Sequence, residues 1–326
     1  MKRWSSFAGL VFTIQAASTI LHAQQAPTQP AKDPAANDDA MKPFEAALRT
    51  NPHDADARAG EVKAAIAAAL EAKRAGDNDG AMVYLVRARK FVPDDPELLF
   101  DFGVQAEVMR LYKDAEEALK QALALRPGDA EIIYALGHVE LDEQKMPQGE
   151  AHLREYLQLK PGDASAHYGL GKLLHMEARD EEARAELQRS IALQPHQTES
   201  YYELGGIELD LQHNGQAAAL FQKVLERNPK HGGALAGMGL IAYREKGYAK
   251  AEAWLKAAVV HAPEYSVAHL YYSMVLARLG KKEEAEKEIA LAKSLAEKER
   301  QDQRGYVLSE PEAQPHLVAA PPCPTT

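Results

Sequence analysis

The side chains that could do chemistry in this chain are scattered histidines and carboxylates. His138 and Asp142 stand four residues apart, so on a helix both would point from one face and could hold a metal ion. His167 and His175 follow in the next stretch of sequence. A metal site needs further ligands, and no third one follows at a usable spacing. We therefore expect ordinary polar surface at these positions, with neither a metal ion nor an organic cofactor.

Motifs that place catalytic groups or phosphates are missing from the sequence. There is no glycine-rich phosphate loop, no His-Glu-x-x-His, no Gly-x-Ser-x-Gly and no paired-cysteine motif. Many acids alternate with lysines, as in "KKEEAEKE" (281–288), which is typical of a solvated helix face. The only cysteine, Cys323, has no second cysteine with which to form a disulfide or a metal site. The sequence thus indicates a protein that is not an enzyme.

The acidic balance of the chain disfavours nucleic acid as a partner. Its formal net charge is −10, and loss of residues 1–23 would remove Lys2 and Arg3 and no acid, giving −12. Binding to a phosphate backbone depends on lysine and arginine displacing counterions. A protein or peptide is the expected partner.

The N-terminus has the pattern of an export signal. Lys2 and Arg3 precede an apolar stretch over 7–21, and Ala23 precedes "QQAP" as expected at a cleavage site. This predicts a signal peptide over 1–23 and a periplasmic or secreted protein. The alternative is an uncleaved segment that anchors the chain in the membrane, because Leu21 stands where a smaller residue is preferred.

Residues recur along the chain with a period of 34. One column is proline: Pro127, Pro161, Pro195, Pro229 and Pro263. A second is glycine: Gly103, Gly137, Gly171, Gly205 and Gly239. A third is small, and its alanines are Ala115, Ala183, Ala217 and Ala251, each followed four residues later by a large apolar residue. Such a register over most of a chain indicates an array of one repeated structural unit.

Each unit has the pattern of two helices. In the unit 130–163, Ile133 and Leu136 follow helical spacing, a polar break follows, and apolar spacing resumes at Leu153. Pro161 should end the second helix, and Asp163 should cap the next one. A glycine or alanine at a helix crossing lets two backbones approach, and the large residue fills the adjoining space.

On these columns the chain resembles the tetratricopeptide-repeat family, whose Leu-Gly, Ala and closing Pro pattern recurs as "LG" at 136–137, 170–171 and 204–205. The resemblance implies an all-α fold, a right-handed α-solenoid of antiparallel helical hairpins with a 34-residue period. The expected units are 96–129, 130–163, 164–197, 198–231, 232–265 and 266–299, the last extended by a capping helix to 304.

The two ends of the array depart from the period. We expect a lone helix at 41–52, then a degenerate unit over 54–95 in which seven extra residues lengthen one helix to about Asp54–Ala75. Residues 24–40 have the composition of a disordered linker, and 305–326 that of a disordered proline-rich tail.

The family resemblance places partner binding on the first helix of each unit, which would line a concave groove. An aromatic column recurs one turn into these helices, and three of its four members are tyrosines. Either the rings pack between hairpins as filler, or they line the groove and offer a partner amphipathic surface. The groove hypothesis names Phe100, Tyr134, His138, Tyr168, Lys172, His175, Tyr202 and Tyr243.

The leading hypothesis is an exported scaffold that binds an extended peptide or a partner helix and helps to assemble an envelope or secreted complex. The groove also carries more acids than bases, which would suit a partner with basic and apolar side chains. Two alternatives stay open: binding of a glycan or the cell wall on the tyrosine stripe, and self-association of the array.

Overall fold

The chain folds into helices throughout the part that the structure describes. The structure, a computed structural model, describes residues 34–308, and within these the side chains of 37–301. The described residues divide after Pro195 into two compact units. Unit A contains α2 (Pro34–Thr50), α3 (Ala55–Arg74), α4 (Asn78–Arg89), α5 (Pro96–Val108), α6 (Tyr112–Leu125), α7 (Ala130–Asp142), α8 (Met146–Leu159), α9 (Ala164–Met176) and α10 (Asp180–Leu193). Unit B contains α11 (Thr198–Asp210), α12 (Asn214–Arg227), α13 (Gly232–Arg244), α14 (Tyr248–His261), α15 (Ser266–Arg278) and α16 (Lys282–Leu308).

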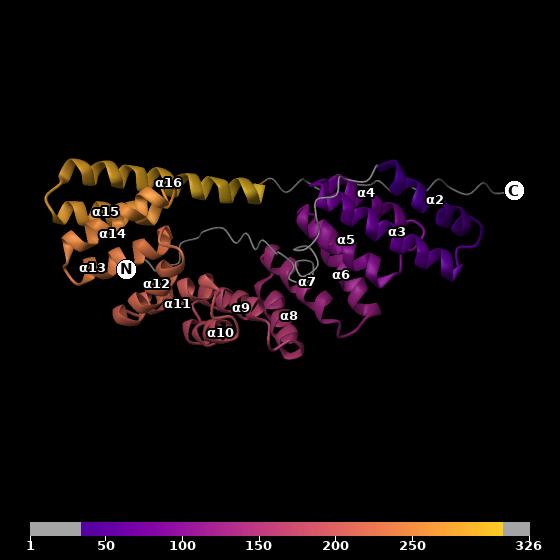
Figure 1. Cartoon of the computed structure of the whole chain (residues 1–326), viewed down its shortest axis with the longest axis horizontal. Coiled ribbons are helices and arrows are strands. Elements are labelled where there is room, and N and C mark those ends of the chain that lie inside the picture. Colours follow the sequence, from indigo (N-terminus) through magenta and orange to yellow (C-terminus); the bar gives the residue numbers. More distant parts are fainter. Residues whose placement is uncertain (1–33, 309–326) are drawn as a thin grey trace. The chain divides into compact units, whose positions relative to one another are not determined.

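Consecutive helices pair as antiparallel hairpins, which can be followed in Figure 1 by their labels. In unit A, α3 pairs with α4, α5 with α6, α7 with α8 and α9 with α10; in unit B, α11 pairs with α12, α13 with α14 and α15 with α16. First helices also touch one another, α3 with α5 and α5 with α7 in unit A, and α11 with α13 and α13 with α15 in unit B. The expected all-α fold of stacked helical hairpins is confirmed.

The turns between hairpins have the predicted chemistry. Asp129 Oδ1 accepts a hydrogen bond from the backbone N–H of Glu131 at 3.0 Å, and Asp163 Oδ1 accepts one from that of Ala166 at 3.0 Å. Each carboxylate thus caps a first helix and satisfies N–H groups that lack a partner inside the helix.

Small residues stand where the two helices of a hairpin cross. A β-carbon added to Gly103 would lie 2.6 Å from Leu119 Cγ, and one added to Gly205 would lie 2.8 Å from Phe221 Cε1. Both large side chains are fully buried. The glycine column and the large apolar column therefore meet as the sequence predicts.

Within each hairpin, one residue of the connecting turn has a left-handed backbone. The seven positions are 34 residues apart, with φ between 60° and 79°: Gly76, Arg110, Gln144, Ala178, Gln212, Lys246 and Gly280. Only the first and last are glycine, the residue that adopts this conformation without steric cost. The five inner hairpins therefore carry a small backbone strain at their turns.

At both ends of the described array, helix boundaries differ from the expected ones. α3 is bounded by Asp54 and Ala75 and matches the predicted long helix. α2, however, begins at Pro34, inside the range expected to be linker, and its Asp38 Oδ1 lies 2.6 Å from Arg87 Nη1 of α4. At the other end α16 continues to Leu308, past the predicted limit at 304. The expected signal segment and most of the linker and tail lie outside the described residues. Among the described helices, none is both long and apolar enough to cross a membrane.

Candidate interaction face

Each residue of the groove hypothesis lies on the first helix of a hairpin. Phe100 lies on α5, Tyr134 and His138 on α7, and Tyr168, Lys172 and His175 on α9; in unit B, Tyr202 lies on α11 and Tyr243 on α13. We call the surface that α5, α7 and α9 form with these residues the first-helix face of unit A. Phe100 at its amino-terminal end is half-buried and packs against the hydrophobic core.

Tyr134 lies at the centre of an aromatic cluster on this face. Its ring centroid is 4.4 Å from that of His138 on the same helix and 4.5 Å from that of Tyr156 on α8. Burial raises the pKa of the Tyr134 hydroxyl, and the negative charges of Asp163 and Glu107 add to the effect. The ring therefore belongs to the packing of its own hairpin, and the side chain is only partly exposed.

His138 is buried and neutral. Only 4% of its surface is exposed, and burial lowers its pKa to about 4, which the charge of Asp163 only partly offsets. An imidazole with such a pKa carries no charge at neutral pH. His138 thus supports Tyr134 from within the hairpin and does not reach the surface of α7.

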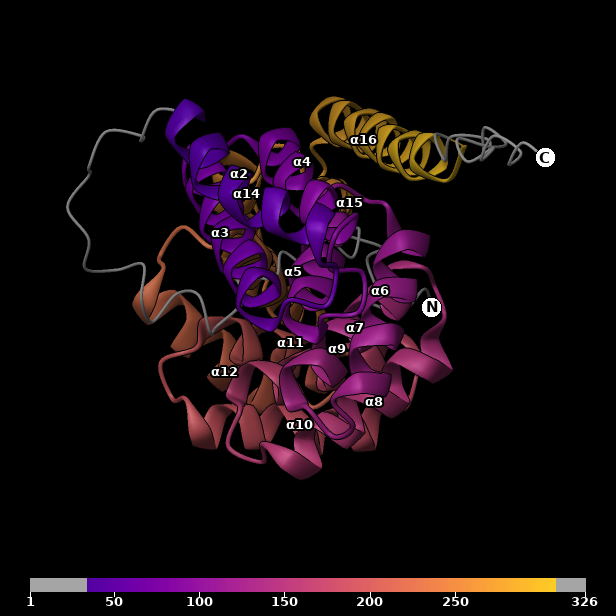
Figure 2. The same ribbon diagram turned by 90° about the vertical axis from the view of Figure 1, so that its right-hand side faces the viewer.

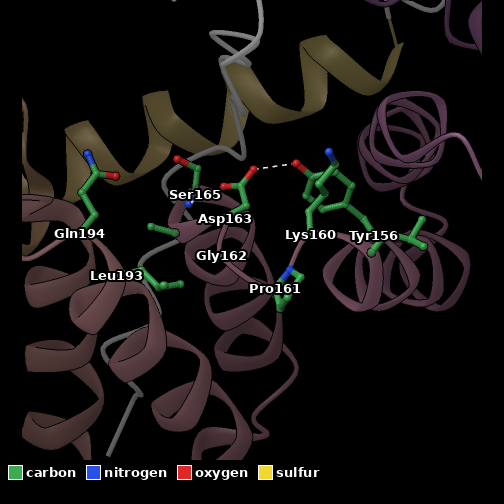
Figure 3. Close-up of a pocket in the computed structure, with 10 residues that line it drawn as sticks. Tyr156, Lys160, Pro161, Gly162, Asp163, Ser165, Leu193 and Gln194 are labelled. Carbon is green, nitrogen blue, oxygen red and sulfur yellow. Dashed lines mark hydrogen bonds between the residues drawn. The ribbon is translucent and has the colours of Figure 1, made fainter.

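Asp163 connects two neighbouring hairpins. The Tyr156 hydroxyl donates a hydrogen bond to Asp163 Oδ2 at 2.7 Å, shown as the dashed line in Figure 3. These two side chains line an open hollow of about 680 Å³ whose apolar walls are Leu159 and Leu193. The hollow lies at the turn between hairpins and not on the first-helix face.

On α9, the three expected residues have different surroundings. Tyr168 and Lys172 are half-buried. His175 is 8% exposed, and its Nδ1 lies 2.8 Å from Asp180 Oδ1 at the start of α10. The pair joins the two helices of one hairpin, so His175 has a structural partner.

In unit B, the two expected tyrosines contact different helices. The Tyr202 ring lies 4.7 Å from the ring of His231, and a β-carbon on Gly233 of α13 would lie 2.5 Å from the Tyr202 hydroxyl. Tyr243 packs 5.7 Å from the Tyr248 ring, and its hydroxyl accepts a hydrogen bond from Arg278 Nε at 3.4 Å. Tyr202 therefore lies between consecutive hairpins, whereas the Tyr243 hydroxyl contacts Arg278 of α15.

Two carboxylates of unit A lie in a poorly solvated part of the first-helix face. Burial raises the pKa of Glu107 on α5 to about 8, and the negative charge of Asp142 on α7 adds to the rise. Burial likewise raises the pKa of Asp142 to about 6, while the charge of Arg110 opposes it. Among the described residues, no side chain forms a hydrogen bond or ion pair with either carboxylate. We call these two residues the acid pair.

The sequence places Glu107 and Asp142 among the acids expected along the groove, where they would suit a basic partner, and it also pairs Asp142 with His138 as half of a metal site. It does not bring Glu107 and Asp142 together as a pair. The signal was their separation of 35, one repeat plus one residue, which puts them at similar levels of neighbouring first helices. Among the described residues, no group of three or more histidine, cysteine or acidic side chains could hold a metal ion.

A second acid on α5 faces a lysine on α3. Burial raises the pKa of Asp101 and lowers that of Lys73, and in each case the opposite charge of the other residue counteracts the effect. These side chains extend the charged part of the first-helix face toward α3.

Comparisons with known proteins agree with this architecture. A protein-family model described as "Tetratricopeptide repeat" matches residues 100–164, 134–198 and 202–266, together half of the chain. A solved tetratricopeptide repeat protein from Parabacteroides merdae aligns with a TM-score of 0.58 at 14% identity, covering 72% of this chain and 93% of its own. The structure of pilF from Pseudomonas aeruginosa aligns with a TM-score of 0.54 at 20% identity, covering 65% of this chain and 97% of its own. None of the curated proteins compared with the chain matches it.

Proposed function

Because the chain belongs to the tetratricopeptide-repeat family, we propose that it is a binding scaffold that holds an extended peptide or a partner helix on its first-helix face. Arrays of this family bind proteins or peptides, and in unit A the helices α5, α7 and α9 are each the first helix of a hairpin and contribute to this face. The proposal gives the chain no catalytic step.

The acid pair is the observation that carries the proposal for unit A. Glu107 and Asp142 lie on neighbouring first helices and are poorly solvated, and the charge of Glu107 acts on the Tyr134 hydroxyl. Keeping two like charges in such a place disfavours the ionised state of both. A lysine or arginine side chain of a partner would stabilise both carboxylates, and the half-buried aromatic ring would contact the adjoining apolar part of the partner.

A direct test compares short labelled peptides of opposite charge. One peptide alternates lysine with leucine, and a matched peptide has glutamate in place of lysine. We expect the basic peptide to bind and the acidic one not to bind, as measured by fluorescence anisotropy at low salt. Glu107→Gln with Asp142→Asn should raise the dissociation constant of the basic peptide at least tenfold, a loss of about 1.4 kcal/mol or more in binding free energy.

The matched control removes two acids from elsewhere on the surface. Glu155 on α8 and Glu226 on α12 are exposed and belong to second helices. Glu155→Gln with Glu226→Gln changes the net charge by the same amount and should leave binding unchanged. Equal weakening by both double variants would show general charge attraction and would contradict the proposal.

Other occupants of the face would give different results. A glycan or cell-wall ligand would be displaced by soluble sugar and would not respond to the charge of a peptide. Self-association would appear as a sedimentation coefficient that rises with protein concentration. Either result, with no preference for the basic peptide, would replace the present proposal.

We also propose that the protein is exported and acts in assembly of an envelope or secreted complex. The support is the N-terminal pattern of Lys2, Arg3 and an apolar stretch that ends before Gln24. The amino-terminal residue of the protein recovered from cells should be Gln24. An intact Met1 on soluble cytoplasmic protein would contradict export, and an intact Met1 on membrane-bound protein would indicate an uncleaved anchor.

A further inference from the structure

The amino-terminal end of unit A contains more buried acid than base. Glu45 of α2 is 4% exposed and pairs with Arg87 Nε of α4. Arg87 also pairs with Asp38 of α2, and Arg49 Nη2 lies 3.5 Å from Glu45. The guanidinium of Arg87 is thus already shared by two carboxylates of α2.

Glu61 of α3 lies beside this cluster and has no cation of its own. Its exposed fraction is 0%, and neither of its carboxylate oxygens has a hydrogen-bond partner among the described residues. The charges that act on it are Glu45 of α2 and, in the opposite sense, Arg87 of α4; α5, which also touches α3, contributes none among the described residues. A buried ionised carboxylate without a partner is strongly unfavourable.

The packing of α2 creates this environment. α2 lies against α3, as Figure 2 shows, and its Met41 and Leu48 are buried in the same core cluster as Ala65 and Ala69 of α3. If α2 departed, Glu45 would leave with it and Glu61 would be open to water.

We propose that α2 is a proton-controlled clasp on the end of the array: it docks on α3 while Glu61 is protonated, and it is released when Glu61 ionises. Release would uncover the apolar face of α3 that α2 now covers. The clasp is independent of the proposed peptide site, which lies on α5 and α7.

The direction of the effect follows from linkage. In the docked state burial, with the charge of Glu45, raises the pKa of Glu61 from 4.5 to about 7, whereas in the released state the ordinary value applies. A group whose pKa is raised by docking favours docking fully below the ordinary pKa, and this contribution is lost as pH rises through the raised value. Docking should therefore weaken between about pH 4.5 and pH 7 and stay weak above it.

Hydrogen exchange of the α2 backbone tests the proposal. Protection factors for residues 37–50, corrected for the intrinsic pH dependence of exchange, should fall about tenfold between pH 6 and pH 8, given the two pKa values. Amides of α14 in unit B provide the internal reference and should not show this fall. Glu61→Gln, which keeps the shape and removes the charge, should keep α2 protected at both pH values.

Asp56→Asn is the matched control, since Asp56 is an exposed acid on the same helix. It should retain the wild-type fall in protection. If Glu61→Gln loses helical circular dichroism, Glu61→Met replaces it as a variant of similar size without polar atoms. Equal protection of wild-type α2 at pH 6 and pH 8, or a persistent fall in the Glu61 variant, would overturn the proposal.

Discussion

The Tyr156 hydroxyl donates a 2.7 Å hydrogen bond to Oδ2 of Asp163, while Oδ1 of the same carboxylate caps α9. One side chain thereby joins the second helix of a hairpin to the first helix of the next. Tyr156→Phe should lower the free energy of unfolding by about 1 kcal/mol, since one hydrogen bond is lost. Asp163→Ala should cost about 2 kcal/mol, because the cap is lost as well.

A substitution at Asp129 distinguishes the contribution of the helix cap from that of the tyrosine hydrogen bond. It caps α7 in the same way, but the residue equivalent to Tyr156 in its hairpin is Ala122, which has no hydroxyl. Urea denaturation followed by circular dichroism should show a smaller loss for Asp129→Ala than for Asp163→Ala. Equal losses would mean that the tyrosine bond contributes nothing.

Glycine at an inner left-handed turn position should stabilise the protein. Ala178 has φ 66° and no polar side chain to compensate for the strain. Ala178→Gly should raise the free energy of unfolding by about 0.5–1 kcal/mol, the steric relief less the added flexibility of the unfolded chain.

The control for that change is Ala185→Gly in the exposed middle of α10. There glycine should lower stability by about 1 kcal/mol, since the backbone is helical. Thermal unfolding of the two variants should shift in opposite directions, and a lower midpoint for Ala178→Gly would disprove the strain argument.

The glycine column predicts a clash that a second substitution relieves. Gly205→Ala would bring the new methyl group against Phe221, so we expect a loss of about 1–3 kcal/mol from overpacking. Phe221→Leu shortens the facing side chain. The double variant should be more stable than the sum of the two single effects predicts, as a double-mutant cycle would measure. Simple additivity would show that the two residues do not compete for the same space.

His138 should make unit A sensitive to acid. Its pKa falls from 6.5 in the unfolded chain to about 4 in the folded state, chiefly through burial. A group whose pKa is lowered by folding gives its full stabilisation above the ordinary value, and this is lost as pH falls through the lowered one. Between pH 6.5 and pH 4 the contribution should shrink by about 3 kcal/mol.

His138→Gln isolates this contribution, because the other titrating groups remain. The difference in unfolding free energy between wild type and variant should be constant above pH 7 and should change below it. A difference that does not vary with pH would mean that the imidazole is charged or solvated in the folded protein.

The acid pair predicts that peptide binding depends on pH. Ionisation of Glu107 and Asp142 becomes easier beside a bound cation, so binding releases protons. The affinity for the lysine–leucine peptide should rise from pH 5.5 to pH 8.5 and then level off, as anisotropy titrations would show. In the Glu107→Gln, Asp142→Asn variant this rise should be absent; a rise that persists would place the titrating groups elsewhere.

Local chemistry made much of the fold predictable. The prolines, the capping aspartates and the glycine column act within or between adjacent helices, so their spacing in sequence determines the hairpins. The long helix α3 was predictable for the same reason, since seven residues add nearly two turns. These features need no knowledge of distant contacts.

The remainder depends on contacts between distant residues. Asp38, near the start of α2, pairs with Arg87, 49 residues away, and the repeat period does not show this contact. The period places Tyr134 on a first helix but does not reveal that its ring packs on Tyr156. Glu61 stands in an alanine-rich helix whose sequence does not indicate that this acid is buried, and in the structure it is 0% exposed where α2 packs on α3.

The place where the chain departs from its period is also where Glu61 lies. α3 has 20 residues and α5 has 13, and the extra seven lie at its amino-terminal end, where they include Glu61. Seven residues shift a helix by only about 20° from a whole number of turns, so the added segment leaves the downstream faces in phase. Seven extra residues therefore do not change which faces of the following helices pack against one another. Loss of these seven residues would shorten α3 and would leave the periodic spacing of the other six described hairpins unchanged.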